Sequence, residues 1–247
     1  MRPTVLLLHI DGTLVTTPGV GRRALEQAFT VRYGRSGVLQ GMQFGGMTDR
    51  ALVRAGLAVL AEPADGAPAE VAIDAILASY IPLLRQEIAE TPGLGVQPGV
   101  RQVLDATARR RAVAVGLGTG NIRAGARLKL GHVGILDRFA FGGFGCDHED
   151  RIEILRIGAA RGASRLGAAL ATCRVVVIGD TPRDVAAARA IGAESIGVGT
   201  CGFGPAELLE SGATYAFADL SDPGVLAALL DAGYVGHPRR TAPPSVG

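Results

Sequence analysis

Apolar runs and amphipathic stretches alternate along most of this chain. The run Val5-Leu6-Leu7-Leu8 is continuously apolar, which is typical of a strand that is buried on both faces of a sheet. We expect strands at about 4–9, 112–117, 139–141, 175–178, 195–198 and 215–217. The helical patterns between them fall at about 100–110, 122–130, 151–160, 182–191 and 223–231. This alternation predicts an α/β fold built on a parallel sheet.

The segment after the first strand has a different pattern. Strand signals are weak from about 16 to 92, and three helices are expected there, at about 20–33, 48–60 and 69–89. Thr48 is placed to cap the second helix, and a cluster of Pro and Gly at 63–68 separates it from the third. We therefore expect a core from 1–15 and 93–233, a helical insertion at 16–92, and a mobile tail at 234–247.

The charge balance limits the classes of partner. The 247 residues include 25 basic and 23 acidic side chains, which give a net charge of +2. This balance gives no reason to expect nucleic acid or a membrane surface as a partner. The run Arg109-Arg110-Arg111 falls where a helix is expected to end, and there it would interact favourably with the helix dipole. An anion-binding patch is the alternative interpretation of this run.

Cysteine usage bears on the compartment. Cys146, Cys173 and Cys201 are odd in number, lie far apart and follow no metal-ligand spacing. The apolar stretch at the amino terminus is too short for a signal peptide or a membrane helix. Together these features predict a reduced, cytoplasmic protein without a structural zinc ion.

Polar residues that suit catalysis or binding follow the ends of three predicted strands, where active sites of open α/β sheets lie. His9 and Asp11 leave the first strand at a spacing of two, so their side chains point to the same side. Thr119-Gly120-Asn121 follows the second strand, where its hydroxyl and N–H groups could hold an anion or merely cap a helix. Gly179-Asp180-Thr181-Pro182-Arg183-Asp184 follows the fourth strand, and Asp180 there suits a magnesium site or a helix cap.

In this order, these motifs resemble those of the haloacid dehalogenase-like (HAD) hydrolases, with a core most similar to phosphoglycolate phosphatase-like members. The first motif of that family is Asp-x-Asp-Gly-Thr-Leu, in which the first Asp is the nucleophile and the second is the general acid/base. This chain has His9-Ile10-Asp11-Gly12-Thr13-Leu14 at that place, so His9 stands at the nucleophile position and Asp11 is kept. The resemblance implies a HAD-like core with an inserted helical cap, and hydrolysis of a small phosphomonoester.

The resemblance also assigns roles to other residues. It implies that Thr119 hydrogen-bonds the phosphoryl group, together with Gly120, Asn121 and Thr13. The cation of the third motif is either Arg151 or Lys129. On the cap, Thr48 and Arg50 are candidates for substrate recognition, or parts of a glycine turn followed by a capped helix. The implied cofactor is Mg²⁺, bound by His9, by the backbone carbonyl of Asp11 and by Asp180, while Asp184 holds metal-bound water or supports these ligands.

Histidine at position 9 changes this chemistry in three ways. It removes one negative charge and the carboxylate that would form an acyl-phosphate, and its nitrogen suits another divalent metal better than Mg²⁺. Several interpretations stay open: His9 as a phosphohistidine nucleophile or a base, new chemistry with Asp11 as acid/base, or a phosphatase-like protein that binds a ligand or partner without turnover. A further interpretation is that His9 is an engineered change in an ordinary phosphatase. The retained polar residues favour a ligand or a reaction over an idle pocket.

Overall fold

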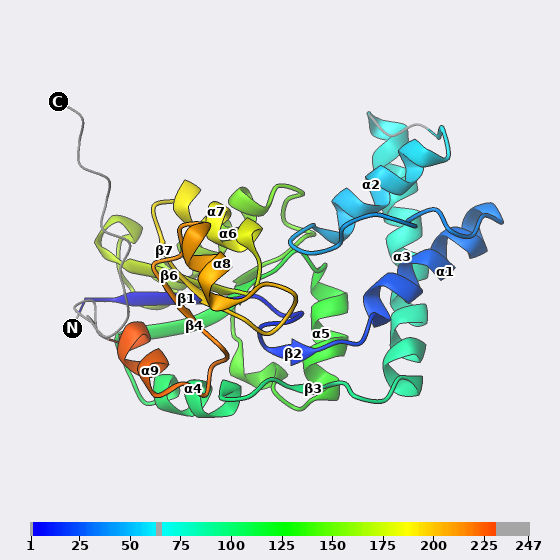
Figure 1. Cartoon of the computed structure of the whole chain (residues 1–247). Coiled ribbons are helices and arrows are strands. Elements are labelled where there is room, and N and C mark those ends of the chain that lie inside the picture. Colours follow the sequence, from blue (N-terminus) through cyan, green and yellow to red (C-terminus); the bar gives the residue numbers. More distant parts are fainter. Residues whose placement is uncertain (1, 63–65, 231–247) are drawn as a thin grey trace.

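The computed structural model describes residues 2–62 and 66–230 (Figure 1). Six parallel strands form one sheet in the order β5-β4-β1-β6-β7-β8. Their bounds are β1 Thr4–Leu8, β4 Val113–Gly118, β5 Gly142–Gly143, β6 Arg174–Gly179, β7 Glu194–Val198 and β8 Tyr215–Phe217. The helices of this core are α4 Val100–Ala108, α5 Arg123–His132, α6 Arg151–Arg165, α7 Pro182–Ala190, α8 Pro205–Glu210 and α9 Pro223–Leu230. Two short 3₁₀ turns, Leu136–Arg138 and Leu170–Thr172, complete it.

The central strand β1 is buried on both faces, as its continuous apolar run predicts. Alternate side chains of a strand point to opposite faces of the sheet. Leu6 and Leu8 therefore pack on the side of α4, α5 and α9, and Val5 and Leu7 pack on the side of α6 and α7. The sheet thus separates two apolar layers and places the end of β1 in the middle of the core.

Three helices form a cap that lies beyond the carboxyl ends of the strands (Figure 1). They are α1 Val20–Tyr33, α2 Asp49–Val59 and α3 Ala67–Glu90, and they bury an apolar cluster of their own that includes Phe29, Leu57 and Tyr80. A small antiparallel pair, β2 Val15–Thr16 and β3 Gly95–Val96, joins the segments that lead into and out of the cap. The cap is therefore inserted after β1, as the pattern of the sequence predicts.

One predicted strand is displaced along the chain. The expected strand at 139–141 is replaced by β5 at Gly142–Gly143, and Phe139 instead follows the 3₁₀ turn. A Cβ on Gly143 would lie 1.9 Å from the carbonyl oxygen of Ile154 in α6, so only glycine fits where the chain passes this helix. The Phe-rich stretch has the higher β propensity, but close packing against α6 determines where pairing occurs.

Other differences are smaller. α6 extends to Arg165 rather than 160, because Gly158 and Gly162 let the helix pack closely on Leu7 and Val5. β2, β3 and α8 were not predicted, because each is short. Asp231, at the end of the last predicted helix, and the predicted mobile tail at 234–247 lie outside the described residues. Within residues 2–62 and 66–230, each helix is too short or too polar to cross a membrane.

Candidate functional site

A cavity of about 760 Å³ lies between the core and the cap. The core contributes residues that follow β1, β4 and β6, and the cap contributes residues of α1, α2 and α3. The lining includes His9, Asp11, Asn121, Lys129, Asp180, Arg22, Phe44, Asp49 and Tyr80. The carboxyl ends of three neighbouring strands therefore open into one cavity, which is where an open α/β sheet places its ligand.

His9 is buried, and its environment determines its protonation. The Nη2 atom of Arg151 lies 2.9 Å from Nδ1 of His9, and Arg151 also forms an ion pair with Asp184. Because a guanidinium can only donate, Nδ1 accepts this hydrogen bond and the ring proton is on Nε2. Burial and, second, the positive charge of Arg151 together lower the pKa of His9 to about 4. The imidazole is therefore neutral at physiological pH, with no free nitrogen lone pair.

Asp11 is held by three donors. Nζ of Lys129 lies 2.7 and 2.9 Å from its two oxygens, Nδ2 of Asn121 donates at 2.7 Å, and the hydroxyl of Thr17 donates at 2.8 Å. Burial alone would raise the pKa of Asp11, but the charge and hydrogen bonds of Lys129 outweigh it and hold this pKa well below its ordinary range. Asp11 is thus an ionised carboxylate in this arrangement, and it lacks the proton that a general acid must supply.

The residues of the second predicted motif lie in two layers. Asn121 lines the cavity and accepts from Lys129 at 2.7 Å through Oδ1. Thr119 lies behind it, fully buried, and its hydroxyl oxygen accepts from the backbone and the side-chain amide of Asn121. Gly120 is in tight contact with the cap, since a Cβ there would lie 2.5 Å from the carbonyl oxygen of Met47. Asn121 is therefore the member of this motif that reaches the cavity.

Both candidates for the cation of the third motif lie in the site. Arg151, at the start of α6, contacts His9 and Asp184, whereas Lys129, on α5, contacts Asp11. Each cation thus serves a different residue of the first motif. The sequence treated them as alternatives, and the structure brings both into the site.

The fourth motif surrounds the end of β6. Thr13 donates to Oδ1 of Asp180 at 2.9 Å, and burial together with the negative charge of Asp184 raises the pKa of Asp180 to about 8. Asp184 caps α7 by accepting from the backbone N–H of Thr181 at 3.1 Å and from its hydroxyl at 2.7 Å. Gly12 is required at the turn between these motifs, because its φ is +84° and a Cβ would lie 2.3 Å from Asp180.

This donor set does not fit the predicted magnesium site. Nδ1 of His9 accepts from Arg151, so the ring has no lone pair left for a metal ion, and both oxygens of Asp184 are engaged by Arg151 and Thr181. In the part of the chain that the structure describes, no group of three or more His, Cys, Asp or Glu is arranged to hold a metal ion. Nε and Nη1 of Arg151 are buried without a hydrogen-bond partner among these residues, and such donors favour an acceptor over a second cation.

The loop before α2 seals the cap onto the core. Thr48 caps α2 through a hydrogen bond from Ala51 at 3.1 Å and donates to the carbonyl oxygen of Glu149 at 3.0 Å. The N–H of Asp49 donates to the carbonyl oxygen of Gly120 at 2.9 Å, and Oδ2 of Asp49 accepts from the N–H of Ile122 at 2.8 Å. Thr48 is therefore a contact between cap and core.

Arg50, the other predicted cap residue, lies in a different environment. It pairs with Glu70 and with Asp74, the latter at 2.6 Å, and both partners belong to α3. This pairing places Arg50 in a charged network within the cap.

Several residues of the cavity wall escaped sequence analysis, among them Asp49, Tyr80 and Thr17. Asp49 follows Thr48 directly, and its acidic side chain in the first turn of a helix reads as ordinary dipole stabilisation. Burial raises its pKa to about 6. Tyr80 sits in the middle of a long helix, and its position gives no signal until the cap is packed onto the core.

Comparisons with known proteins identify the family of this chain and structures with a similar fold. A family model described as haloacid dehalogenase-like hydrolase matches residues 6–192. The crystal structure of CbbY from Rhodobacter sphaeroides in complex with phosphate is 18% identical, with a TM-score of 0.63, and the match covers 93% of this chain and 99% of that chain. The β-phosphoglucomutase of Clostridium difficile is 18% identical, with a TM-score of 0.62 and coverage of 90% and 92%.

A third similar structure is that of a predicted phosphoglycolate phosphatase from Haemophilus somnus. It is 15% identical, with a TM-score of 0.60, and the match covers 90% of this chain and 96% of that chain. At such identities the three structures show the fold alone, and the helical cap is consistent with them. No curated protein matches the chain.

Proposed function

Because the chain belongs to the haloacid dehalogenase-like hydrolases, we propose that it binds a phosphorylated small molecule between core and cap without forming an acyl-phosphate. The pairing of His9 with Arg151 carries this proposal. Position 9 has no carboxylate that could attack phosphorus, and the imidazole is neutral with its proton on Nε2. A nitrogen nucleophile needs a free lone pair, so this arrangement also disfavours a phosphohistidine.

The same pairing supports binding of an anion. His9 lines the cavity, and since its Nδ1 is occupied by Arg151, the Nε2–H group is the ring donor left for a ligand. The amide of Asn121 and the ammonium of Lys129 line the same cavity. A phosphoryl group that displaced part of the Asp11 contact would receive donors from two elements, as phosphate sites commonly provide. A volume of about 760 Å³ suits a small organic ligand.

The state of Asp11 argues against new chemistry in which this residue is the acid. Its low pKa keeps it deprotonated at neutral pH, and the same donors make it a weak base. Its role here is to hold Lys129 and Asn121 in place. The retained polar residues then act as a binding site rather than as a set of proton-transfer groups.

A second candidate function rests on Asp49. This carboxylate lines the cavity and has a pKa of about 6, within the range of a general base that activates water. Direct attack of water on a bound phosphomonoester would then give slow hydrolysis without a covalent intermediate. Such activity would rise with pH near 6, and Asp49→Asn would abolish it.

Calorimetric titration with inorganic phosphate, p-nitrophenyl phosphate and a set of sugar phosphates tests the proposal. We expect at least one compound to bind the chain as given, and no phosphate release from it. Asn121→Ala is the variant that removes a cavity donor, and we expect it to weaken that binding about tenfold. Exposed Arg32→Gln, on the outside of α1, is the matched control and should bind normally. Absence of binding across the set, or turnover that leaves His9 phosphorylated, would overturn the proposal.

A further inference from the structure

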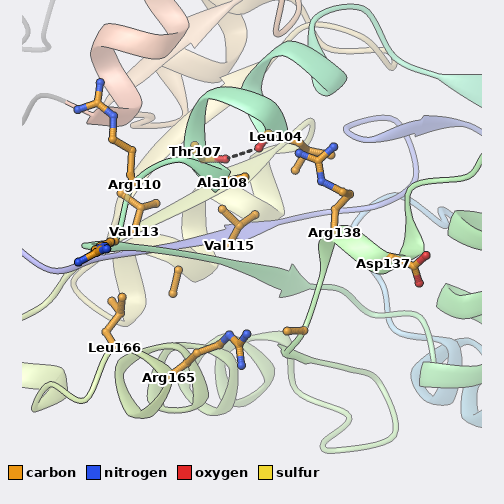
Figure 2. A pocket seen from close by; sticks show the side chains of 13 residues that line it. Leu104, Thr107, Ala108, Arg110, Val113, Val115, Asp137, Arg138, Arg165 and Leu166 are labelled. Atoms are coloured by element: carbon orange, nitrogen blue, oxygen red, sulfur yellow. Dashed lines mark hydrogen bonds between the residues drawn. The ribbon is translucent and has the colours of Figure 1, made fainter.

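A second cavity, of about 520 Å³, lies at the opposite end of β4 and takes no part in the proposed function (Figure 2). It is bounded by α4, by the carboxyl-terminal end of α6 and by the start of β4. Its lining contains four arginines, from three different elements: Arg110, Arg111, Arg138 and Arg165. The first cavity lies beyond the other end of β4, so the two cavities are separated by the length of that strand.

The arginines of this cavity outnumber its acidic side chains, since Asp137 is the acidic residue in the lining. Arg138 pairs with Asp105 at 2.8 Å. Arg110, Arg111 and Arg165 are exposed, and their side chains form no hydrogen bond or ion pair with any residue that the structure describes. α4 ends at Ala108, so Arg110 and Arg111 lie beyond the last turn that they were expected to stabilise. Guanidinium groups that meet without partners favour phosphate or carboxylate groups.

The edge of β4 adds hydrogen-bonding groups to this cavity. β1 pairs with residues 113–117 of β4, but β5 pairs only with Leu117 and Gly118. In a parallel pair, alternate residues direct both backbone groups to the same neighbour. Since Ala112 accepts from Thr4 on the β1 side and Leu117 donates to Phe141 on the outer side, Val115 directs its N–H and C=O outward. An adjacent donor and acceptor are therefore presented at an open sheet edge.

Most of the other lining residues are apolar. Leu104, Ala108, Val113 and Leu166 line the cavity, and Figure 2 shows Val113 and Val115 on the strand between the arginines. The hydroxyl of Thr107 is committed to its own helix, since it donates to Val103 at 2.8 Å. A ligand with an apolar or planar body and anionic groups at its periphery would match both parts of this surface.

We propose that this second cavity binds an organic polyphosphate of nucleotide size. Its phosphate groups contact Arg110, Arg111 and Arg165, and its planar body lies on the apolar wall. The backbone groups of Val115 meet one acceptor and one donor of that body. The volume falls within the range of small-molecule sites, and the arginines supply the charge that two phosphates require. This inference does not rest on the proposed function of the first cavity.

Calorimetric titration with ADP, pyrophosphate and adenosine tests the inference on the full chain. We expect ADP to bind, pyrophosphate to bind more weakly and adenosine more weakly still. The double variant Arg110→Gln/Arg165→Gln should reduce ADP affinity at least tenfold, and both side chains are exposed and unpaired, so folding is not at risk. The matched control Arg32→Gln/Arg85→Gln removes two exposed arginines of the cap and should leave affinity unchanged.

Methyl NMR places the bound ADP. We expect shift changes at Leu104, Val113 and Val115, which line the second cavity. Changes confined to Leu25 and Leu52, which line the first cavity, would overturn the inference. So would the absence of ADP binding, equal losses in the control variant, or pyrophosphate that binds as tightly as ADP, since the nucleoside body would then contribute nothing.

Discussion

Arg151 donates to Nδ1 of His9 at 2.9 Å while it forms an ion pair with Asp184. A single buried guanidinium therefore joins the residue at the nucleophile position to the carboxylate that caps α7. The resemblance implied a third-motif cation beside a nucleophilic carboxylate at position 9. The protein keeps the cation, Arg151, but places a neutral imidazole beside it, so the positive charge is retained while the nucleophile is lost.

Restoring the carboxylate should restore metal binding. In His9→Asp, a second carboxylate joins Asp180, whose Oδ2 is uncommitted among the described hydrogen bonds. Hard oxygen ligands favour Mg²⁺. We expect His9→Asp to bind Mg²⁺ in calorimetry and the chain as given to bind it at least tenfold more weakly. His9→Asn is the control, because it removes the imidazole without adding charge; Mg²⁺ binding by this variant would argue against the account.

Removing Arg151 should destabilise the fold strongly. Arg151→Gln leaves Asp184 buried without its cation, and breaking a buried pair costs about 3–5 kcal/mol of unfolding free energy. Asp184→Asn in the same background should recover much of this loss, as measured by denaturant unfolding. The exposed pair of Arg156 with Glu153 is the control, and Arg156→Gln should cost less than about 1 kcal/mol. Equal effects at the two sites would contradict the buried pairing.

The pKa of His9 should respond to the same change. Burial and Arg151 lower it, whereas Asp184 and Asp11 raise it. In the variant Arg151→Gln burial and Lys129 still lower the pKa, but the charge of Arg151 no longer does, so the pKa should rise from about 4. Imidazole NMR titration measures this shift, and an unchanged pKa would show that the ring does not face Arg151.

Asp49 should make stability depend on pH. Its folded pKa, about 6, lies above the ordinary value of 3.8, so the folded state binds more protons than the unfolded state between these values. The stability from Asp49 is therefore fully present below about pH 4 and falls as pH rises to about 6. Asp49→Asn keeps an acceptor for the N–H of Ile122 and should remove this loss of stability with rising pH. Between pH 4 and pH 7, the unfolding free energy of the variant should therefore gain about 1–3 kcal/mol on that of the unaltered chain. Denaturant unfolding across this pH range measures the effect. An equal dependence of unfolding free energy on pH in the unaltered chain and in Asp49→Asn would contradict the account.

Gly12 should tolerate no side chain. Its positive φ and the proximity of Asp180 both oppose a Cβ, so Gly12→Ala should cost more than about 2 kcal/mol. Gly34 also has a positive φ, 64°, but a Cβ there would meet no atom within 4 Å. Gly34→Ala should therefore cost about 1 kcal/mol, and thermal unfolding of both variants separates backbone strain from the clash. A smaller loss at Gly12 than at Gly34 would contradict the geometry.

Much of the site was predictable because parallel strands bring their carboxyl ends to one edge. His9, Asp11, Asn121 and Asp180 meet there although 171 positions separate the first and last of them. The apolar run of β1 and the capped helices were visible as local patterns. The same logic could not choose between Arg151 and Lys129, since that depends on how far each side chain reaches from its helix.

What escaped prediction depends on contacts between distant segments. Asp49 and Tyr80 enter the cavity only when the cap packs onto the core, and no local pattern contains that orientation. The position of β5 was missed because Gly143 is selected by the closeness of α6 rather than by strand propensity. Arg110 and Arg111 were expected to interact with the dipole at the end of α4, but this helix ends at Ala108, before both residues.

The most direct test of the central claim measures phosphate release from a set of phosphomonoesters with Mg²⁺, in parallel for the chain as given, His9→Asp and His9→Asn. The account predicts that only His9→Asp releases phosphate, because it alone regains a carboxylate nucleophile beside Asp180. Release by the chain as given at a rate equal to that of His9→Asp would contradict it, since His9 would then belong to a working catalytic mechanism.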